Sequence, residues 1–414
     1  MISIAIFMTL ISPFTALIPA AAMLYAVHKN KMLVFLNPLN IGIVLIFGSS
    51  LLSGLFNRDK ISTIASFGIL LYLGLCIYFQ NNYTEESKVE KLALKVMLLS
   101  LITVAIGISE KIASFFFDMT WISELFWSPT YIPTKAAYRI YSTFGNPNVA
   151  GDWFACMFLI CIYFIQKSAN KKNDDEPKTA STNKHFFNYL YQTLLSNKKR
   201  IAYAICATLF IITTLLTGSK GSLIGLEIAI LTYAIFTKCK QTRIVLITTF
   251  FLVIVMAFTL PVMNHSLNSR AGLWQQCLIL SNQKPLLGWG LFGIFNQIGE
   301  IHGHNIWITL LTTLGFTGLC IYLSMKLYLM KGIMSLYSKG STIVPLLAAI
   351  QAFIIGHGLV DFTLLLPQTG MLFFTTSAII SGLDQKYNEY PAVDWANLQT
   401  AIKPHPSNLT SKSS

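Results

Sequence analysis

The stretch His302-Gly303-His304-Asn305 combines the residue types in this chain that are best suited to chemistry. It ends a polar segment and is followed at once by a long apolar run, so two imidazoles and an amide are expected at a membrane surface. A histidine titrates close to neutral pH, which suits acid–base chemistry or contact with phosphate. We predict that His304 acts on a reacting group and that His302 and Asn305 contact substrate. Interfacial histidines without a role are the alternative.

The same histidines are not expected to hold a metal ion. Zinc sites use three or four protein ligands, and Glu300 is the only carboxylate close by in this segment. We therefore predict no metal and no other cofactor.

Three cations lie in polar connections that the charge pattern places on the same side of the membrane. Arg139 precedes the turn GNPN at 145–148, Lys220 lies in the short turn TGSKGS at 217–222, and Arg270 lies near the expected start of a helix. Arg270 gains nothing from the helix dipole, whose positive end is there, and the turn at 217–222 lacks the Gly-Lys-Ser/Thr order of a phosphate loop. Solvated arginines and a snorkelling lysine are the alternatives.

An acidic residue, Asp361, ends the stretch GHGLVD at 356–361. His357 and Asp361 are spaced i,i+4 and are expected to meet on one helix face. Ionisable groups at membrane depth are costly and often functional, although a buried structural pair is the alternative. Asn148 is interpreted as a helix cap, and Asp152 and Glu227, inside apolar runs, are weaker candidates.

The composition shows which elements must position these residues. The 414-residue chain is 54% hydrophobic and 11% charged, with a mean hydropathy of +0.59. A soluble globular chain carries about 25% charged residues, so we predict an all-α membrane protein. About eleven apolar runs are long enough to cross a bilayer. They are roughly 3–26, 32–55, 61–80, 92–108, 149–166, 201–217, 221–237, 244–262, 305–325, 343–358 and 368–382.

The net charge of +13 mostly reflects how the chain is oriented in the membrane. Most Lys and Arg fall in alternate loops, as the positive-inside rule requires, so a nucleic-acid partner is not expected. The loops with more Lys and Arg are assigned to the cytoplasm, and the candidate residues above to the outer face. The seven cysteines include no CxxC pair, and several lie inside apolar runs. They indicate neither a disulfide framework nor a zinc ribbon.

Two aromatic-rich polar segments, 109–148 and 263–304, are expected to form amphipathic elements on the outer face, since aromatic side chains favour the lipid–water interface. We divide the chain into N-terminal spans with an outer loop (1–135), a catalytic membrane region (136–382) and a cytoplasmic tail (383–414) that is expected to be disordered.

The cations Arg139, Lys220 and Arg270, the His–Asn element and Asp361 share one side of the membrane in this topology. Positive side chains that converge at an outer leaflet suit a lipid-linked pyrophosphate, because charge-assisted hydrogen bonds to phosphate are strong and Arg can bind it bidentately. The aromatic side chains nearby can stack on sugars.

Several of these motifs, in this order, resemble the O-antigen ligase and Wzy-type O-antigen polymerase family. The similarity covers roughly 136–370. The residues that carry it are Thr143-Phe144-Gly145-Asn146-Pro147-Asn148, Arg270 with Trp274, Pro285-Leu286-Leu287-Gly288-Trp289-Gly290, His304-Asn305-x9-Gly315-x-x-Gly318 and Asp361. Lys220 departs from the pattern, since the corresponding turn in this family usually carries Arg.

This resemblance implies a metal-independent inverting glycosyltransferase of the GT-C type in a bacterial inner membrane. The donor would be a glycan on undecaprenyl pyrophosphate, and the acceptor a hydroxyl of another glycan or of lipid A core. Arg270 would bind the pyrophosphate and His304 would position or deprotonate the acceptor. A chain-length regulator is a possible partner in this family. The alternative is a transporter or flippase of the same lipid-linked glycan, which needs the cations but no acceptor activation.

Overall fold

The computed structural model describes residues 2–119, 121–122, 138–174, 183–259, 264–364, 366–388 and 391–394, with side chains described outside 170–196, 252–269 and 394. These described residues are mostly helical (77%). In chain order the helices are α1 (Ile2–Ile11), α2 (Ile18–Lys29), α3 (Pro38–Phe56), α4 (Lys60–Ser66), α5 (Gly68–Asn82), α6 (Glu86–Ala113), α8 (Pro147–Asp174), α9 (Asn183–Leu216), α10 (Lys220–Phe236), α11 (Lys240–Thr259), α12 (Asn264–Gln283), α13 (Gly293–Ile298), α14 (Ile306–Ser338), α15 (Val344–His357) and α16 (Pro367–Gln385).

In the part of the chain that the structure describes, every apolar run predicted from the sequence contains helix, which is consistent with an all-α membrane protein. Within the described residues, six helices are long and apolar enough to cross a bilayer: Pro38–Phe56, Lys60–Asn82, Glu86–Ala113, Pro147–Ala169, Asn197–Leu216 and Ile306–Ser338. The count of eleven spans is therefore not confirmed. The run 3–26, for example, is divided into α1 and α2 by a turn that contains Pro13, since proline cannot donate a backbone hydrogen bond inside a helix.

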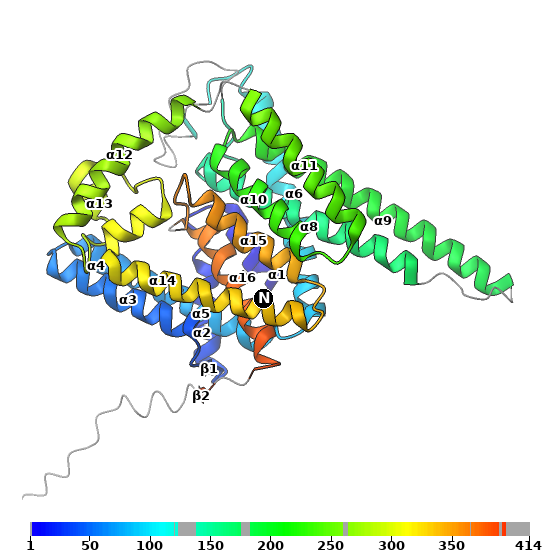
Figure 1. Cartoon of the computed structure of the whole chain (residues 1–414), viewed down its shortest axis with the longest axis horizontal. Helices are drawn as coiled ribbons and strands as arrows, with labels where there is room; N and C mark the ends of the chain where they lie inside the picture. The colour runs from blue at the N-terminus through cyan, green and yellow to red at the C-terminus, as the bar shows by residue number, and fades with distance from the viewer. Residues whose placement is uncertain are drawn as a thin grey trace, which may run out of the picture.

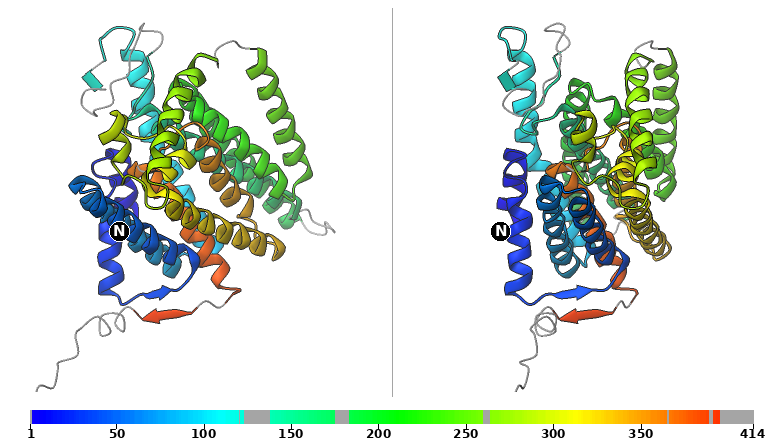
Figure 2. Two further views of the ribbon diagram at one scale, coloured as in Figure 1. Left: turned by 60° about the vertical axis from the view of Figure 1, so that its left-hand side comes forward. Right: turned by 90° about the vertical axis from the view of Figure 1, so that its left-hand side faces the viewer.

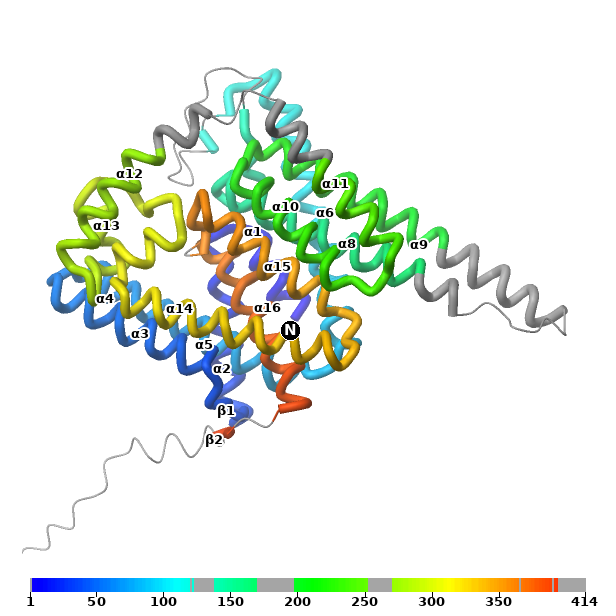
Figure 3. Tube along the Cα trace, in the orientation of Figure 1, coloured from blue at the N-terminus to red at the C-terminus, as the bar shows by residue number. Residues whose placement is uncertain are grey.

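Helices from the two ends of the chain pack directly on one another. α3 lies against α14, and α5 lies against α2 and α16 (Figure 1). α8 and α9 form a long antiparallel pair, and α10 packs along α15 (Figure 3). α8 is the most enclosed of the six candidate spans, with 78% of its apolar window buried. The helices of 1–135 and of 136–382 thus share one bundle, and the division between them stays a prediction.

A short two-stranded sheet closes one end of the molecule (Figure 2). The strands β1 (Leu33–Phe35) and β2 (Ala392–Asp394) pair antiparallel. The tail 383–414 was expected to be disordered. That expectation is wrong for residues 383–385, which end α16, and for β2, whose backbone groups pair with β1. Residues 389–390 and 395–414 lie outside the described residues.

The helix that follows the His–Asn element, α14, is broken at Gly315. This residue has φ 65° and ψ −166°, which is far from helical. The glycine-rich loop 285–290 fills the break. The amides of Trp289 and Gly290 donate to the carbonyls of Thr312 and Thr313 (2.9 Å each), and the amide of Phe316 donates to the carbonyl of Pro285 (2.8 Å). The broken helix therefore leaves these backbone groups satisfied, as burial in an apolar bundle requires.

Two glycines make this close approach possible. A Cβ at Gly315 would lie 2.3 Å from the carbonyl carbon of Leu286, and one at Gly288 would lie 2.4 Å from that of Thr313. Both glycines also have positive φ, which side chains disfavour. The segment 263–304, expected to carry an amphipathic element, forms α12 and α13, and both contact α14. Residues 120 and 123–137 of the other aromatic segment, 109–148, lie outside the described residues.

Candidate functional site

Asp361 is the centre of the candidate site. It lies in the connection between α15 and α16, with a side chain that is 3% exposed. Its Oδ1 lies 3.0 Å from Nδ1 of His304 and 3.8 Å from Nε2 of His302. The amide of Asn148 donates to its Oδ2, and the backbone amide of Phe362 donates to Oδ1 (2.8 Å). One carboxylate thus joins two imidazoles from the His–Asn element to the start of α8.

The backbone before α14 turns both imidazoles toward this carboxylate. His304 has a left-handed φ of 47°, and its amide donates to Nδ1 of His302 (3.2 Å). The two rings cross at 75° with centroids 4.5 Å apart. The side chain of His304 is 32% exposed and that of His302 is 15% exposed. Of the two imidazoles, His304 is the more accessible to a reactant.

Asn305 fixes the position of this segment. Its Oδ1 caps α14 by accepting from the amides of Trp307 (2.9 Å) and Ile308 (3.1 Å), and its Nδ2 donates to the carbonyl of Leu359 (2.9 Å). The next amide, that of Ile306, donates to the carbonyl of Gly358 (2.7 Å). Both ends of the Asn305 amide are therefore used to tie the start of α14 to the Asp361 loop, which makes it a positioning residue.

Arg139 approaches the carboxylate through Asn148. Its Nη2 donates to Oδ1 of Asn148 (2.6 Å), whose Nδ2 in turn donates to Asp361. Nε of Arg139 donates to the carbonyl of Thr217 (2.7 Å), in the turn that precedes α10. Gly218 of that turn has a φ of 61°, and a Cβ there would lie 3.3 Å from the Arg139 side chain. The glycine lets the turn close over the guanidinium.

The other two predicted cations lie on α12 and α10. Nη1 of Arg270 donates to the carbonyl of Val360, the residue before Asp361. Lys220 is the first residue of α10 and is half-buried; Ser219 caps that helix by accepting from the amide of Ser222 (3.2 Å). Arg270 thus reaches the Asp361 loop itself, and Lys220 lies three residues after Thr217, the contact of Arg139.

The electrostatics of the site follow from burial and from the proximity of its charges. Burial alone would raise the pKa of Asp361, but the hydrogen bond with His304 and the nearby imidazoles hold it below its usual value. Burial lowers the pKa of His302 to about 4, so this ring is neutral at physiological pH. Burial also lowers the pKa of Arg139, and the positive charge of Arg270 adds to that effect. The two guanidiniums are therefore close enough to repel each other electrostatically.

A metal ion is one occupant that this geometry permits. His302, His304 and Asp361 each offer one ligand atom, and these atoms lie within 4.8 Å of one another. The third ligand is Asp361, which sequence reasoning had not grouped with the histidines. The two neighbouring guanidiniums disfavour a cation here and favour an anion.

A second buried cluster lies behind Asp361. His357 Nε2 lies 3.2 Å from Oδ1 of Asp152, which also accepts from the Ser222 hydroxyl (2.8 Å), while Oδ2 of Asp152 accepts from Thr363 (2.6 Å). The expected pairing of the His357 and Asp361 side chains is therefore wrong. The amide of Asp361 still donates to the carbonyl of His357 (3.0 Å), one helical turn earlier, but the His357 side chain lies against Asp152 of α8.

The structure brings together most of the predicted site residues. His302, His304 and Asp361 meet directly, and Arg139 and Arg270 each reach them through one intermediate group. The sequence analysis missed Asn148 as the bridge, because an Asn in an Asn-Pro-Asn turn is usually a cap, and it ranked Asp152 too low. The signal for Asp152 was an ionisable side chain inside an apolar run.

No protein-family model and no curated protein matches this chain.

Proposed function

We propose that this chain is a membrane glycosyltransferase of the GT-C type that moves a glycan from undecaprenyl pyrophosphate to an acceptor hydroxyl at the outer face of a bacterial inner membrane. The observation that carries the proposal is the contact of His304 Nδ1 with Asp361 Oδ1 at 3.0 Å, beside the guanidiniums of Arg139 and Arg270. The motifs that resemble O-antigen ligases and polymerases supply the substrate class.

His304 is the general base in this proposal. With Nδ1 turned to Asp361, Nε2 is the nitrogen left to accept a proton, and the carboxylate stabilises the imidazolium that forms. The acceptor hydroxyl attacks the anomeric carbon of the donor sugar while its proton moves to His304 Nε2. The bond from that carbon to the phosphate oxygen breaks, the electron pair leaves with the pyrophosphate, and the configuration inverts.

The cations stabilise the departing pyrophosphate. Arg139 and Arg270 retain guanidinium N–H groups beyond those hydrogen-bonded in the structure. In our proposal Lys220, the first residue of α10, adds a third positive charge. One preorganised donor is commonly worth about 3 kcal/mol of transition-state stabilisation, so two or three cations can take the place of the metal ion used at many glycosyl-transfer sites.

The proposal allows two kinds of acceptor. A polymerase would use the end of another lipid-linked glycan, and a ligase would use lipid A core. In the polymerase case a chain-length regulator is the expected protein partner. The polymerase is the form we favour, because the Asn-Pro-Asn turn is more typical of polysaccharide polymerases.

The test uses a strain that lacks the chain and carries wild type, Arg270→Ala or Arg270→Lys. Gel profiles of surface glycan should show loss of long or attached chains with Arg270→Ala, at normal protein levels in the membrane, and partial recovery with Arg270→Lys. Attached single units without long chains indicate a polymerase, and loss of all attachment indicates a ligase. A wild-type profile from Arg270→Ala would remove the pyrophosphate role, and loss of transport without loss of transfer would indicate a flippase.

A further inference from the structure

A basic pocket lies at the end of α6 that is remote from the candidate site. It has a volume of about 330 Å³ and is lined by Lys88, Lys91 and Lys95 from α6 together with polar residues at the end of α5. The three lysines are exposed and are spaced i, i+3 and i+7, so they form one stripe along the helix. Lys88 and Glu110 are 22 residues apart on α6, or about 33 Å. The carboxylate of Glu110 accepts from the amide of Tyr141, near Arg139, so the stripe and the site lie at opposite ends of a membrane-length helix.

The acidic residues of the same turns mostly face away from this stripe. Glu86 accepts from the hydroxyl of Thr342 (2.7 Å), and Glu90 pairs with Lys167. On the α6 helical wheel Glu86 lies about 140° from Lys91 and about 180° from Lys95, and Glu90 lies about 100° and about 140° from them. Glu85 pairs with Lys88 at 3.1 Å, which is an exposed and therefore weak contact. Among the described residues, Lys91 and Lys95 form no ion pair, so the mouth of the pocket is positively charged.

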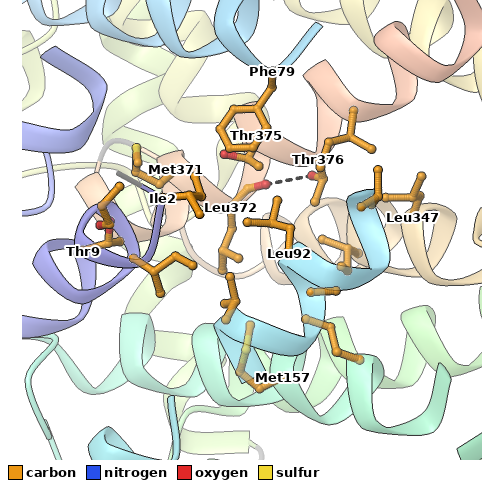
Figure 4. A pocket seen from close by; sticks show the side chains of 18 of the residues that line it. Ile2, Thr9, Phe79, Leu92, Met157, Leu347, Met371, Leu372, Thr375 and Thr376 are labelled. Carbon is orange, nitrogen blue, oxygen red and sulfur yellow. Dashed lines mark hydrogen bonds between the residues drawn. The ribbon is translucent and has the colours of Figure 1, made fainter. Parts of the chain in front are cut away.

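An apolar cavity adjoins this pocket. It has a volume of about 110 Å³ and runs between α1, α5, α6, α8, α15 and α16 (Figure 4). Two of the few polar groups in its wall are already hydrogen-bonded within the protein. The hydroxyl of Thr376 donates to the carbonyl of Leu372 (2.8 Å), and that of Thr9 donates to the carbonyl of Ala5 (2.9 Å). A cavity with this lining does not hold water, but it can accommodate hydrocarbon.

The two spaces meet, because Ile2 and Leu92 line both of them. The combination of a positive mouth and an apolar interior matches an anionic headgroup joined to a hydrocarbon chain. We propose that this end of the chain binds an anionic phospholipid, with its phosphate at Lys91 and Lys95 and a few methylene groups of one acyl chain in the apolar cavity. This site is independent of the glycan-transfer site and does not rest on the proposed function.

The experiment measures lipid retention by the full-length chain, purified in a non-ionic detergent, with native mass spectrometry. The probes are phosphatidylglycerol and phosphatidylcholine with identical acyl chains. We expect wild type to retain phosphatidylglycerol preferentially. The triple variant Lys88→Gln, Lys91→Gln, Lys95→Gln should weaken its apparent Kd about tenfold, because each lysine near a headgroup contributes to anion binding. All three side chains are exposed, so this variant should fold.

Two comparisons make the result specific. A matched triple variant at the exposed lysines Lys29, Lys199 and Lys331, each changed to Gln, has the same loss of charge and should bind as wild type does. Ala93→Phe keeps the lysines but fills the cavity that Ala93 lines, and it should also weaken retention of phosphatidylglycerol. Equal retention of both lipids, equal loss in the matched triple, or full retention by Ala93→Phe would each overturn the proposal. None of these results depends on whether the chain transfers glycan.

Discussion

At the scale of single residues, the site separates a group that acts from a group that holds it. His304 is 32% exposed and Asp361 is 3% exposed, so a reactant can reach the imidazole but not the carboxylate. Asp361 also accepts from Asn148 and Phe362, which fixes its orientation. In our account the carboxylate sets the tautomer of His304 and stabilises its charged form, and it does not attack the sugar.

Replacing the carboxylate tests this division. Asp361→Asn keeps an acceptor for the Asn148 amide but removes the negative charge that supports an imidazolium. We expect glycan transfer to fall by about 10²–10⁴-fold, with the protein still present in the membrane at wild-type levels. The measurement is the initial rate of chain transfer in isolated membranes, normalised to the amount of protein. A rate within about threefold of wild type would leave His304 without the partner that our account gives it.

His302 gives a prediction about pH. Burial lowers its pKa to about 4 in the folded chain, against about 6.5 in an unfolded chain. Because the folded state disfavours the protonated ring, this group's contribution to stability is present above pH 6.5 and is lost as the pH falls from 6.5 toward 4. His302→Gln retains an acceptor for the His304 amide but does not titrate. Between pH 7.5 and pH 5, wild type should lose about 2 kcal/mol more stability than the variant.

Unfolding of the two proteins in the same detergent at both pH values measures that difference. The other titrating groups are common to both proteins, so the comparison isolates His302. An equal loss of stability in the two proteins would mean that the ring is not buried as the structure has it.

At the scale of elements, the glycine-rich loop 285–290 and the glycine run that begins at Gly315 pack together and form one junction. The loop 285–290 inserts into the break in α14 at Gly315 through the backbone hydrogen bonds described above. This holds α12, α13 and the first part of α14 together. Arg270 on α12 and His304 before α14 are thereby fixed relative to each other.

Gly315→Ala should disrupt this junction. A Cβ would lie 2.3 Å from the carbonyl carbon of Leu286, and the φ of 65° adds strain. We expect a loss of several kcal/mol of stability, on the order of the largest single-residue effects, seen as a strongly reduced yield of folded protein in detergent. Gly48→Ala in α3 is the matched control, since a Cβ there has no atom within 4 Å. It should be neutral or slightly stabilising, and equal yields of the two variants would contradict this account of the junction.

The sequence predicted part of this arrangement and not the rest. The His304-Asn305-x9-Gly315 spacing predicted the helix that became α14, but the sequence analysis predicted a substrate contact for Asn305 and not the cap that it forms. The break at Gly315 could not be predicted, because a glycine in an apolar run is compatible with an unbroken helix. Pairing of His357 with Asp152 depends on α8 and α15 lying side by side, which spacing along the chain does not reveal.

At the scale of the whole molecule, the bundle assembles the site from segments far apart in the chain. Asn148 starts α8, Arg270 lies on α12, His304 precedes α14 and Asp361 follows α15. Hydropathy correctly predicted a mostly helical chain with long apolar helices, and within the described residues six of the eleven predicted spans are long and apolar enough to cross a bilayer. A run of apolar residues can reflect burial inside the helix bundle as well as contact with lipid. The 14-residue helix α15 is apolar because it is buried.

The orientation of the bundle is a prediction with its own test. Most Lys and Arg outside the site lie in loops assigned to the cytoplasm, so the end that carries His304 should face outward. In a background without the exposed Cys320, Asn296→Cys should react with a membrane-impermeant thiol reagent in intact spheroplasts. Lys199→Cys should react only after the membrane is opened. The side chains of Asn296 and Lys199 are both exposed. The reverse labelling pattern would place the candidate site at the cytoplasmic face.

The most direct test of the central claim is transfer in a purified system. The full-length chain in detergent is supplied with a short glycan on undecaprenyl pyrophosphate and an acceptor glycan, without added metal, and the release of undecaprenyl pyrophosphate is measured together with the new glycosidic bond. We predict that wild type forms both products in equal amounts and that His304→Ala lowers both by at least about 100-fold. Equal rates for wild type and His304→Ala would contradict the account.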